Sequence, residues 1–496
     1  MNVAPLDFVV LGTYLIGTAL FGAWIGRKQT SANDYMLGGR SMPWWLVLAS
    51  IVATETSTVT FLSIPGVSWA SDLTWVQLPM GFLVGRLVIL AVFLPRYFQG
   101  EVVTVYQILR ERFGGAVQPV ASVLFLGMRV IADGLRLGLS ALVLEAMTGL
   151  SLITSIIVLG TVTILYTLIG GMRAVIWTDF VQFVVYTLGA VIAFVLLLRG
   201  IDGGFAAVLD TARENPTGID KLRIFDFDFV LDRHKNFWAG IVGGTVLSIG
   251  SHGVDQLMVQ RYLCAKNRRH ASWALGLSGV VVLLQFGFFL VVGLALYTFF
   301  LQHPPQPPFG PNDGDRVFTK FLIENLPTGL LGVVLGSLFA VIMSTLSSSL
   351  NSAATVTVHD LLDRVRPAPS DRIRLRRARI ATAVFGIALV LAAISVRNFE
   401  RSTVDRVLGI AGLSTGLVLG LFALGMLTRR TGSTAALVGM GIATAVMVWI
   451  QGYTTVAWPW YALIGCIITF TAGLLASLLV ERSPPGDLHR PRHPAR

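Results

Sequence analysis

The stretch Ser337–Thr355 reads SLFAVIMSTLSSSLNSAAT and combines the apolar character of a membrane span with many hydroxyl groups. These hydroxyl groups include those of Ser344, Thr345, Ser347, Ser348, Ser349, Ser352 and Thr355. Ser344, Ser347 and Ser348 stand at i, i+3 and i+4, so they share one face of a helix. Hydroxyl and carbonyl oxygens suit a hard cation, but small hydroxyl residues also let helices pack closely in lipid. The stretch therefore indicates either an ion site or a close helix contact.

The composition is that of a polytopic membrane protein. Of the 496 residues, 54% are hydrophobic and only 13% are charged. Runs of about 20 apolar residues are the signal of a membrane-spanning helix, and the chain has thirteen such runs. They lie near 6–26, 43–68, 75–98, 118–148, 151–170, 175–199, 237–260, 273–300, 328–353, 378–396, 404–427, 433–452 and 459–480. Each span must satisfy its own backbone hydrogen bonds in lipid, which predicts an all-α fold.

The basic residues predict the orientation in the membrane. Most of the 38 Lys and Arg residues fall in cytoplasmic segments if the N-terminus lies outside and the C-terminus lies in the cytoplasm. The net charge of +11 is then a topology signal, and we expect no nucleic-acid partner. The first span is followed directly by the membrane domain and does not resemble a cleaved signal peptide. We expect a multi-pass protein of a bacterial inner membrane, functional as a monomer.

Two of the spans look interrupted. Residues 49–66 mix hydroxyl groups with Glu55 and end in Pro-Gly, and residues 239–256 contain five glycines. Transporters often carry broken helices at matching places in two halves, although close helix packing also explains the glycines. The two segments begin repeats of five helices, at 43–199 and 237–427, that have opposite topology.

The remaining parts of the chain complete a single membrane domain over residues 1–480. One extra helix at 6–26 precedes the repeats and two at 433–480 follow them. Residues 481–496 are predicted to form a disordered cytoplasmic tail because they are rich in Pro, Arg and His.

Charged residues inside the spans are functional candidates because insertion of each costs about 2.5–3.5 kcal/mol. Arg129, Asp133 and Arg136 lie at i, i+4 and i+7 and share one helix face. They form either a structural ladder of ion pairs or a ladder with one positive charge left for a carboxylate. Arg86 is interpreted as structural or snorkelling. His252 is interpreted as part of a hydrogen-bond network within the bundle.

Four motifs, in order along the chain, resemble those of the sodium/solute symporter family, which includes sodium-coupled sugar, proline, pantothenate and sialic acid carriers. They are SIVATETSTVTFLSIPG (50–66), YTLIGGMRAVIWTDFVQ (166–182), SHGVDQLMVQRYL (251–263) and MSTLSSSLNSAAT (343–355). The resemblance runs from the first span to about residue 430. It implies a LeuT-type fold of two inverted five-helix repeats.

The resemblance also implies where sodium binds. A first site would use the backbone carbonyls of Ala53, Thr56 and Val341 and the hydroxyls of Ser344 and Thr345. A second site would use Asp179, Ser347 and Ser348. Na⁺ is the coupling ion, and no organic cofactor is expected.

For the solute, the likeness to sialic acid carriers places Ser57, Thr60 and Trp75 in the cavity, with Gln77 nearby. Three positions depart from those carriers. Glu55 stands where they have a small hydroxyl residue, and Pro79 replaces a glutamine. Ala132 stands where they have the arginine that holds a carboxylate, so Arg129 or Arg136 would have to substitute.

Glu55 has three interpretations: it binds a polar group of the solute, pairs with Arg129 or Arg136, or carries a proton. The prediction is a Na⁺-coupled symporter that imports a small polar organic solute, one that bears a carboxylate, by alternating access. A proton-coupled carrier of the same fold is the alternative. A membrane sensor would need an output domain, and an enzyme would need a catalytic constellation; neither is found in the sequence.

Overall fold

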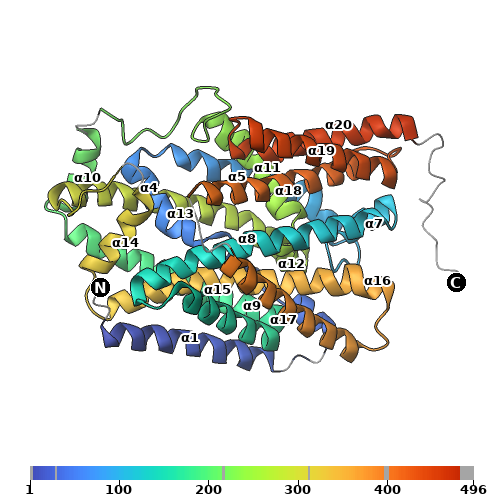
Figure 1. Ribbon diagram of the computed structural model, residues 1–496, viewed down its shortest axis with the longest axis horizontal. Coiled ribbons are helices and arrows are strands. Elements are labelled where there is room, and N and C mark those ends of the chain that lie inside the picture. The colour runs from blue at the N-terminus through green and yellow to red at the C-terminus, as the bar shows by residue number, and fades with distance from the viewer. Residues whose placement is uncertain are drawn as a thin grey trace.

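The computed structural model describes residues 4–27, 29, 31–214, 218–310, 313–395 and 401–480. Over these residues the chain forms a bundle of helices and no strand. Figure 1 shows the long helices lying along one direction, with α1 at one edge and α19 and α20 at the opposite edge. The predicted tail at 481–496 lies outside the described residues.

The long helices are α1 (Pro5–Gly26), α3 (Trp44–Glu55), α4 (Thr58–Ala70), α5 (Gln77–Val88), α8 (Val117–Thr148), α9 (Leu152–Arg199), α13 (Arg268–Gln302), α14 (Gly314–Asn325), α15 (Leu330–Val356), α17 (Asp371–Ser395), α18 (Arg401–Leu427), α19 (Ser433–Tyr453) and α20 (Tyr461–Val480). The shorter ones are α2 (Ala32–Leu37), α6 (Leu94–Tyr97), α7 (Gln107–Phe113), α10 (Gly204–Arg213), α11 (Gly244–Ser248), α12 (Gln256–Leu263) and α16 (Asp363–Val365). Of the described helices, eight are long and apolar enough to cross a membrane, or nine if the bent pair formed by α3 and α4 counts as one span. The count of thirteen spans stays a prediction.

The sequence predicts two separate spans at 151–170 and 175–199, whereas the structure has a single helix, α9, over both. The division between them is a kink at Gly171, where φ is 50° and ψ is −161°. Glycine has no Cβ and adopts a positive φ without steric cost. The chain therefore changes direction at one residue instead of through a loop.

The second predicted span is broken where the sequence indicated. Helix α3 ends at Glu55, and Thr56 and Ser57 are extended, with ψ angles of 117° and 166°. Ser57 Oγ then accepts a hydrogen bond from Thr60 N at 3.2 Å and caps α4. The axes of the two helical pieces differ by 60°.

The seventh predicted span is broken as well. Its first part consists of short π-helical and α-helical pieces between Ala239 and Val254. Asp255 is extended and its Oδ1 accepts from Leu257 N at 2.8 Å, which starts α12. Both predicted interruptions are therefore confirmed.

Helix α15 carries the hydroxyl-rich stretch and lies in the centre of the bundle. Every residue from Val334 to Val356 is buried. It packs against α1, α3, α8, α9 and α17. Its hydroxyl groups therefore face protein on all sides.

The 219–238 loop is attached to the far end of α4 by a buried lysine. Lys221 Nζ donates to the carbonyl oxygens of Trp69 at 2.7 Å and Ser71 at 3.0 Å, and it lies 4.0 Å from the centre of the Tyr297 ring. Burial lowers the pKa of Lys221 to about 8. The lysine satisfies carbonyls at the end of α4 that have no partner within the helix.

Helix α1 approaches α9 so closely that only glycine fits at the contact. A Cβ added to Gly26 would lie 2.8 Å from the carbonyl oxygen of Ile169, beside the backbone of Gly170. A Cβ added to Gly17, in the same helix, would have no atom within 4 Å. The extra N-terminal helix is therefore held against the kinked part of α9.

We expect Gly26→Ala to lower the free energy of unfolding by about 1–3 kcal/mol, because the two backbones must separate. Gly17→Ala is the matched control and should leave stability unchanged or raise it, since alanine favours a helix by roughly 1 kcal/mol over glycine. Thermal unfolding of the purified variants in detergent measures both. Equal midpoints for the two variants would contradict the close contact.

Candidate functional site

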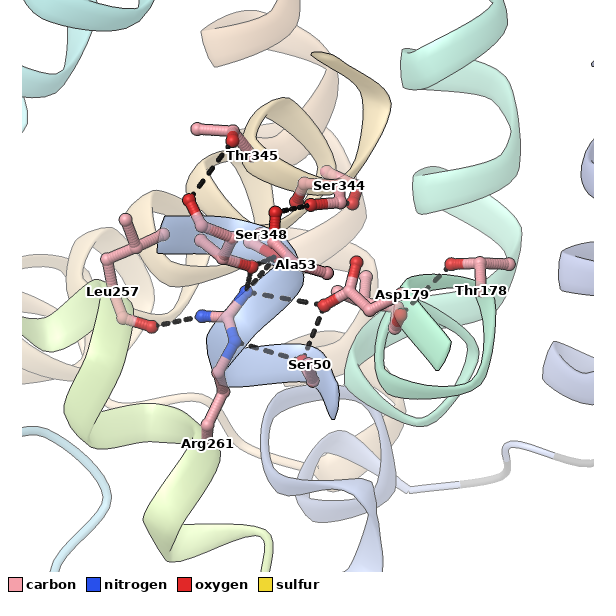
Figure 2. A network of polar contacts seen from close by, with 12 residues as sticks. Ser50, Ala53, Thr178, Asp179, Leu257, Arg261, Ser344, Thr345 and Ser348 are labelled. Atoms are coloured by element: carbon pink, nitrogen blue, oxygen red, sulfur yellow. Dashed lines mark hydrogen bonds and ion pairs between the residues drawn. The ribbon is translucent and has the colours of Figure 1, made fainter. Parts of the chain in front are cut away.

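The first predicted sodium ligands converge where α3 ends against α15. Ser344 Oγ donates to the carbonyl oxygen of Ala53 at 2.7 Å, as Figure 2 shows. Thr345 Oγ1 lies 3.2 Å from the carbonyl oxygen of Thr54 and 3.4 Å from that of Val341. All these residues are buried. Four of the five predicted residues are thus brought together.

The Ala53 and Thr54 carbonyls are available because α3 stops at Glu55. In a continuous helix, the Ala53 carbonyl would accept from the backbone N–H of residue 57. Here Ser57 N lies 3.4 Å from Thr60 Oγ1 instead. A freed carbonyl buried in a bundle needs a donor or a cation, and α15 supplies hydroxyl groups at this point.

Thr56, the fifth predicted residue, sits at the break itself. Its hydroxyl lies 2.8 Å from the carbonyl oxygen of Val52 and 3.1 Å from Gln285 Oε1. Tyr186 Oη is 3.4 Å away. Gln285 and Tyr186 were missed by the sequence reasoning. The available signal was a single glutamine inside the apolar run 273–300.

The residues of the second predicted site surround a buried arginine. Arg261 Nη2 lies 3.4 Å from Asp179 Oδ2 and also donates to Ser348 Oγ and Thr54 Oγ1. Figure 2 shows the guanidinium beside Asp179, Ser348 and Ser50. The Ser50 hydroxyl bonds the same Asp179 oxygen. Both charged side chains have an exposed fraction of 0%.

Ser347, the third residue of that prediction, forms a hydrogen bond within its own helix. Its hydroxyl donates to the carbonyl oxygen of Ser344 at 3.2 Å. Arg261 belongs to the motif SHGVDQLMVQRYL but was not considered, because it lies one residue beyond the predicted end of the span 237–260. The tertiary structure places it in the polar centre.

Glu55 pairs with Arg86, and not with Arg129 or Arg136 as one interpretation held. Arg86 Nη2 bonds Glu55 Oε2 directly, and His252 Nε2 is 3.2 Å from the same Arg86 nitrogen and 3.4 Å from the Glu55 oxygen. The Arg86 side chain has an exposed fraction of 0%. It therefore lies inside the bundle and does not snorkel. His252 takes part in the hydrogen-bond network that was predicted.

The arginine ladder on α8 is present and has an additional member. Arg136 Nη1 is 2.9 Å from Asp133 Oδ1, and Arg129 Nη1 is 3.7 Å from Asp133 Oδ2. Arg129 Nη2 also lies 2.5 Å from Asp255 Oδ2. The two arginines and the two aspartates carry equal and opposite charge. The positive charge that was expected to remain on the ladder is therefore neutralised by Asp255.

The two arginines of the ladder differ in exposure. The Arg129 side chain is 16% exposed and holds two carboxylates, whereas Arg136 is 35% exposed and holds one. Arg136 also lines a cavity of about 20 Å³ between α8, α15 and the start of α4. The other residues that line this cavity are Ser57, Leu139, Ser140, Val341, Ile342, Thr345 and Leu346.

Two predicted solute ligands lie at the 219–238 loop. The Trp75 ring is 5.8 Å from the His234 ring, and Gln77 Oε1 accepts from Asp226 N at 3.4 Å. Neither residue lines the Arg136 cavity. Thr60, by contrast, lies next to the break between α3 and α4, where its hydroxyl contacts that of Ser57. A role for Trp75 and Gln77 in solute binding stays a prediction.

Broken helices and buried ion pairs inside a bundle of apolar helices are features of a membrane transporter. The model of the sodium:solute symporter family matches residues 35–443, and the chain belongs to this family. It is therefore a multi-pass, sodium-coupled symporter and not an enzyme.

Individual relatives cover almost the whole chain. The sodium/sialic acid symporter NanT of Aliivibrio fischeri is 28% identical, over 97% of this chain and 95% of that protein. The human sodium-coupled monocarboxylate transporter 2 is 30% identical, over 90% of this chain and 72% of that protein. A solved structure of a Na⁺-coupled sialic acid symporter, substrate-bound and outward-open, superposes with a TM-score of 0.88 at 26% identity, covering 97% of this chain and 98% of that one.

We expect Arg86→Met to lower the free energy of unfolding by about 3–5 kcal/mol, because it leaves Glu55 buried without its cation. The double variant Glu55→Met/Arg86→Met should recover much of the loss, since it removes both charges. Arg372→Met on the exposed start of α17 is the control and should change stability by less than about 0.5 kcal/mol. Thermal unfolding compares them. An unaltered Arg86→Met midpoint would show that the pair is absent.

Proposed function

We propose that this chain is a secondary active transporter that imports a small organic carboxylate together with Na⁺ by alternating access. The observation that carries the proposal is the contact of the Ser344 and Thr345 hydroxyls with carbonyls freed at the end of α3. Neutral oxygens from two separate helices bind a monovalent ion only weakly, because they carry no formal negative charge. The ion can therefore be released on the other side.

In the proposed first site, Na⁺ is held by the carbonyls of Ala53, Thr56 and Val341 and by the hydroxyls of Ser344 and Thr345. On ion binding, each hydroxyl turns its lone pair to the cation and gives up its hydrogen bond to a carbonyl. For Ser344, both partners of that hydrogen bond then become ligands, because the Ala53 carbonyl also belongs to the proposed set. Bound Na⁺ thereby links the broken α3–α4 span to α15.

Such a link couples the ion to the conformation. Na⁺ binds more tightly to a state in which α3 and α15 touch, so it raises the population of that state. By reciprocity, a solute that prefers the same state binds more tightly in sodium. An imported positive charge also gains about 2.3 kcal/mol per 100 mV of inside-negative potential.

Arg136 is the proposed partner of the solute carboxylate. It has one carboxylate partner where Arg129 has two, and it lines the cavity next to the break. A guanidinium binds a carboxylate through two parallel hydrogen bonds. The relatives named above transport sialic acid and monocarboxylates, both of which carry that group. Ser57 and Thr60 supply hydroxyl groups at the same break.

A second sodium ion is proposed at Asp179, Ser347 and Ser348. With two Na⁺ and a monoanionic solute, each cycle would move one net charge. The proton-coupled alternative is weaker, because Glu55 and Asp179 each have a guanidinium partner. Protonation of either carboxylate would remove the negative charge that its guanidinium partner neutralises.

We also propose the wider setting of the transporter. The membrane domain spans residues 1–480, with repeats at 43–199 and 237–427, and functions as a monomer in a bacterial inner membrane. The N-terminus lies outside and the C-terminus in the cytoplasm. The distribution of Lys and Arg along the chain supports this orientation.

We expect Ser344→Ala and Thr345→Ala to raise the Na⁺ concentration for half-maximal uptake by roughly threefold to tenfold, the effect of losing one ligand. Ser352→Ala on the same helix is the control, because its hydroxyl donates only to the Ser349 carbonyl of its own helix. Uptake is measured in vesicles with separate Na⁺ and pH gradients. Uptake driven by the pH gradient alone, or unchanged sodium dependence in both variants, would overturn the proposal.

Arg136→Gln should weaken carboxylate binding by about 2 kcal/mol, roughly thirtyfold, because a charged partner is lost. The measurement is thermal stabilisation of purified protein in sodium by a panel of sialic acid and short monocarboxylates. Arg136→Lys, which keeps the charge, should retain part of the stabilisation. If Arg136→Gln is stabilised as much as the parent protein, the carboxylate binds elsewhere.

A further inference from the structure

Four buried polar atoms at the junction of α1, α9 and α15 have no hydrogen-bond partner among the described residues. They are Tyr14 Oη, Asp179 Oδ1, Gln182 Oε1 and Gln182 Nε2. A buried polar atom without a partner costs free energy comparable to a lost hydrogen bond. Such groups are rare in folded proteins and usually mark a bound water or ion. This group of three side chains is called the α1–α9 cluster below.

The side chains of the α1–α9 cluster come together from two helices. Gln182 follows Asp179 by three residues on α9, so both share one helix face. The Tyr14 hydroxyl, on α1, lies beside Gln182 and Thr18. The close contact of α1 with α9, described above at Gly26, brings the two helices within reach.

Helix α15 borders the α1–α9 cluster on the third side. The Tyr166 hydroxyl donates to the carbonyl oxygen of Met343 at 2.9 Å and lies beside Ser347 and Gln182. Ser347 is one of the residues proposed for the second sodium ion. The unpartnered atoms of the cluster therefore adjoin that site.

The two oxygens of Asp179 have different surroundings. Oδ2 accepts from Ser50 and lies near Arg261, as Figure 2 shows. Oδ1 has no partner. Arg261 thus holds the carboxylate in place through one oxygen and leaves the other for a second cation.

We propose that Tyr14 and Gln182 complete the second sodium site, with Tyr14 Oη and Gln182 Oε1 acting as ligands beside Asp179 Oδ1 and Ser347. The inference rests on the proposed function and extends it to α1, a helix outside the two repeats. Arg261 is a positioning residue for this site. The first sodium site would then join α3 to α15, and the second would join α9 and α15 to α1.

The chemistry of the α1–α9 cluster favours a monovalent cation. Its ligand atoms are one carboxylate oxygen, one amide oxygen and hydroxyl oxygens, which suit a hard ion. A divalent ion requires more negative charge. Throughout the described part of the chain, no three His, Cys, Asp or Glu side chains are grouped to hold a metal. Water alone would satisfy the hydroxyl and the amide but would leave the carboxylate oxygen with a weaker partner.

The test uses Tyr14→Phe, which removes only the hydroxyl, and Gln182→Met, which keeps the length of the side chain. Each variant should raise the Na⁺ concentration for half-maximal uptake by roughly threefold to tenfold and lower the Hill coefficient for Na⁺ from about two towards one. The number of ²²Na⁺ ions bound per purified protein should fall from two to one at moderate sodium. Gln182→Met covers the case in which Tyr14→Phe fails to fold.

Tyr35→Phe is the matched control, because it also removes a buried tyrosine hydroxyl, one that bonds Thr382 Oγ1 at 2.9 Å. It should leave the Hill coefficient and the sodium count unchanged. If Ser344→Ala alters sodium dependence but Tyr14→Phe and Gln182→Met do not, the α1–α9 cluster binds water and this inference is wrong, while the proposed function stands. If none of the three alters sodium dependence, the proposed function fails as well.

Discussion

The structure depends on the contact between a helix that stops inside the bundle and a helix that does not. Where α3 ends at Glu55, its last carbonyls lose their partners in the helix, and the hydroxyls of Ser344 and Thr345 on α15 replace them. An unsatisfied carbonyl is unfavourable in an apolar environment, so this contact stabilises the interrupted helix against α15. The same oxygens can bind a monovalent cation. One constraint of the bilayer thereby stabilises the interrupted span and brings together the oxygens that are proposed to bind the coupling ion.

The charges inside the bundle follow a related rule. Glu55 with Arg86, Asp179 with Arg261, and Asp133 and Asp255 with Arg129 and Arg136 all combine opposite charges. A single buried charge is unfavourable, whereas a pair with further hydrogen bonds is tolerated. The pairs connect α3 with α5, α9 with α12, and α8 with the break at Asp255. Asp179 keeps one carboxylate oxygen without a partner, and Arg136 pairs with a single carboxylate. A cation is proposed at the first of these residues and an anionic solute at the second.

Much of this arrangement could be predicted from local patterns. The apolar runs, the glycine-rich and hydroxyl-rich interruptions, and the i, i+4, i+7 ladder on α8 depend only on residues close together in the chain. Both breaks were found where expected, and four motifs led to the symporter family, whose model matches residues 35–443. The hydroxyls of Ser344 and Thr345 were also expected to meet the break, because the family resemblance relates these two segments. Partners that come from different helices were predicted less well. One of the three interpretations of Glu55 paired it with Arg129 or Arg136 instead of Arg86. Arg261, Gln285 and Tyr14 were not considered.

The amino-acid sequence by itself determined that this chain spans a membrane, where its helices are interrupted and which residues carry hydroxyl groups inside the spans. These properties follow from hydrophobicity, helix periodicity and backbone hydrogen bonding, all of which act over one or two turns. Only the tertiary structure decided that Arg86 neutralises Glu55, that Asp255 neutralises Arg129 and that a guanidinium lies against Asp179. The physical reason is that the strength of an ion pair depends on the distance between side chains whose positions are set by the packing of whole helices.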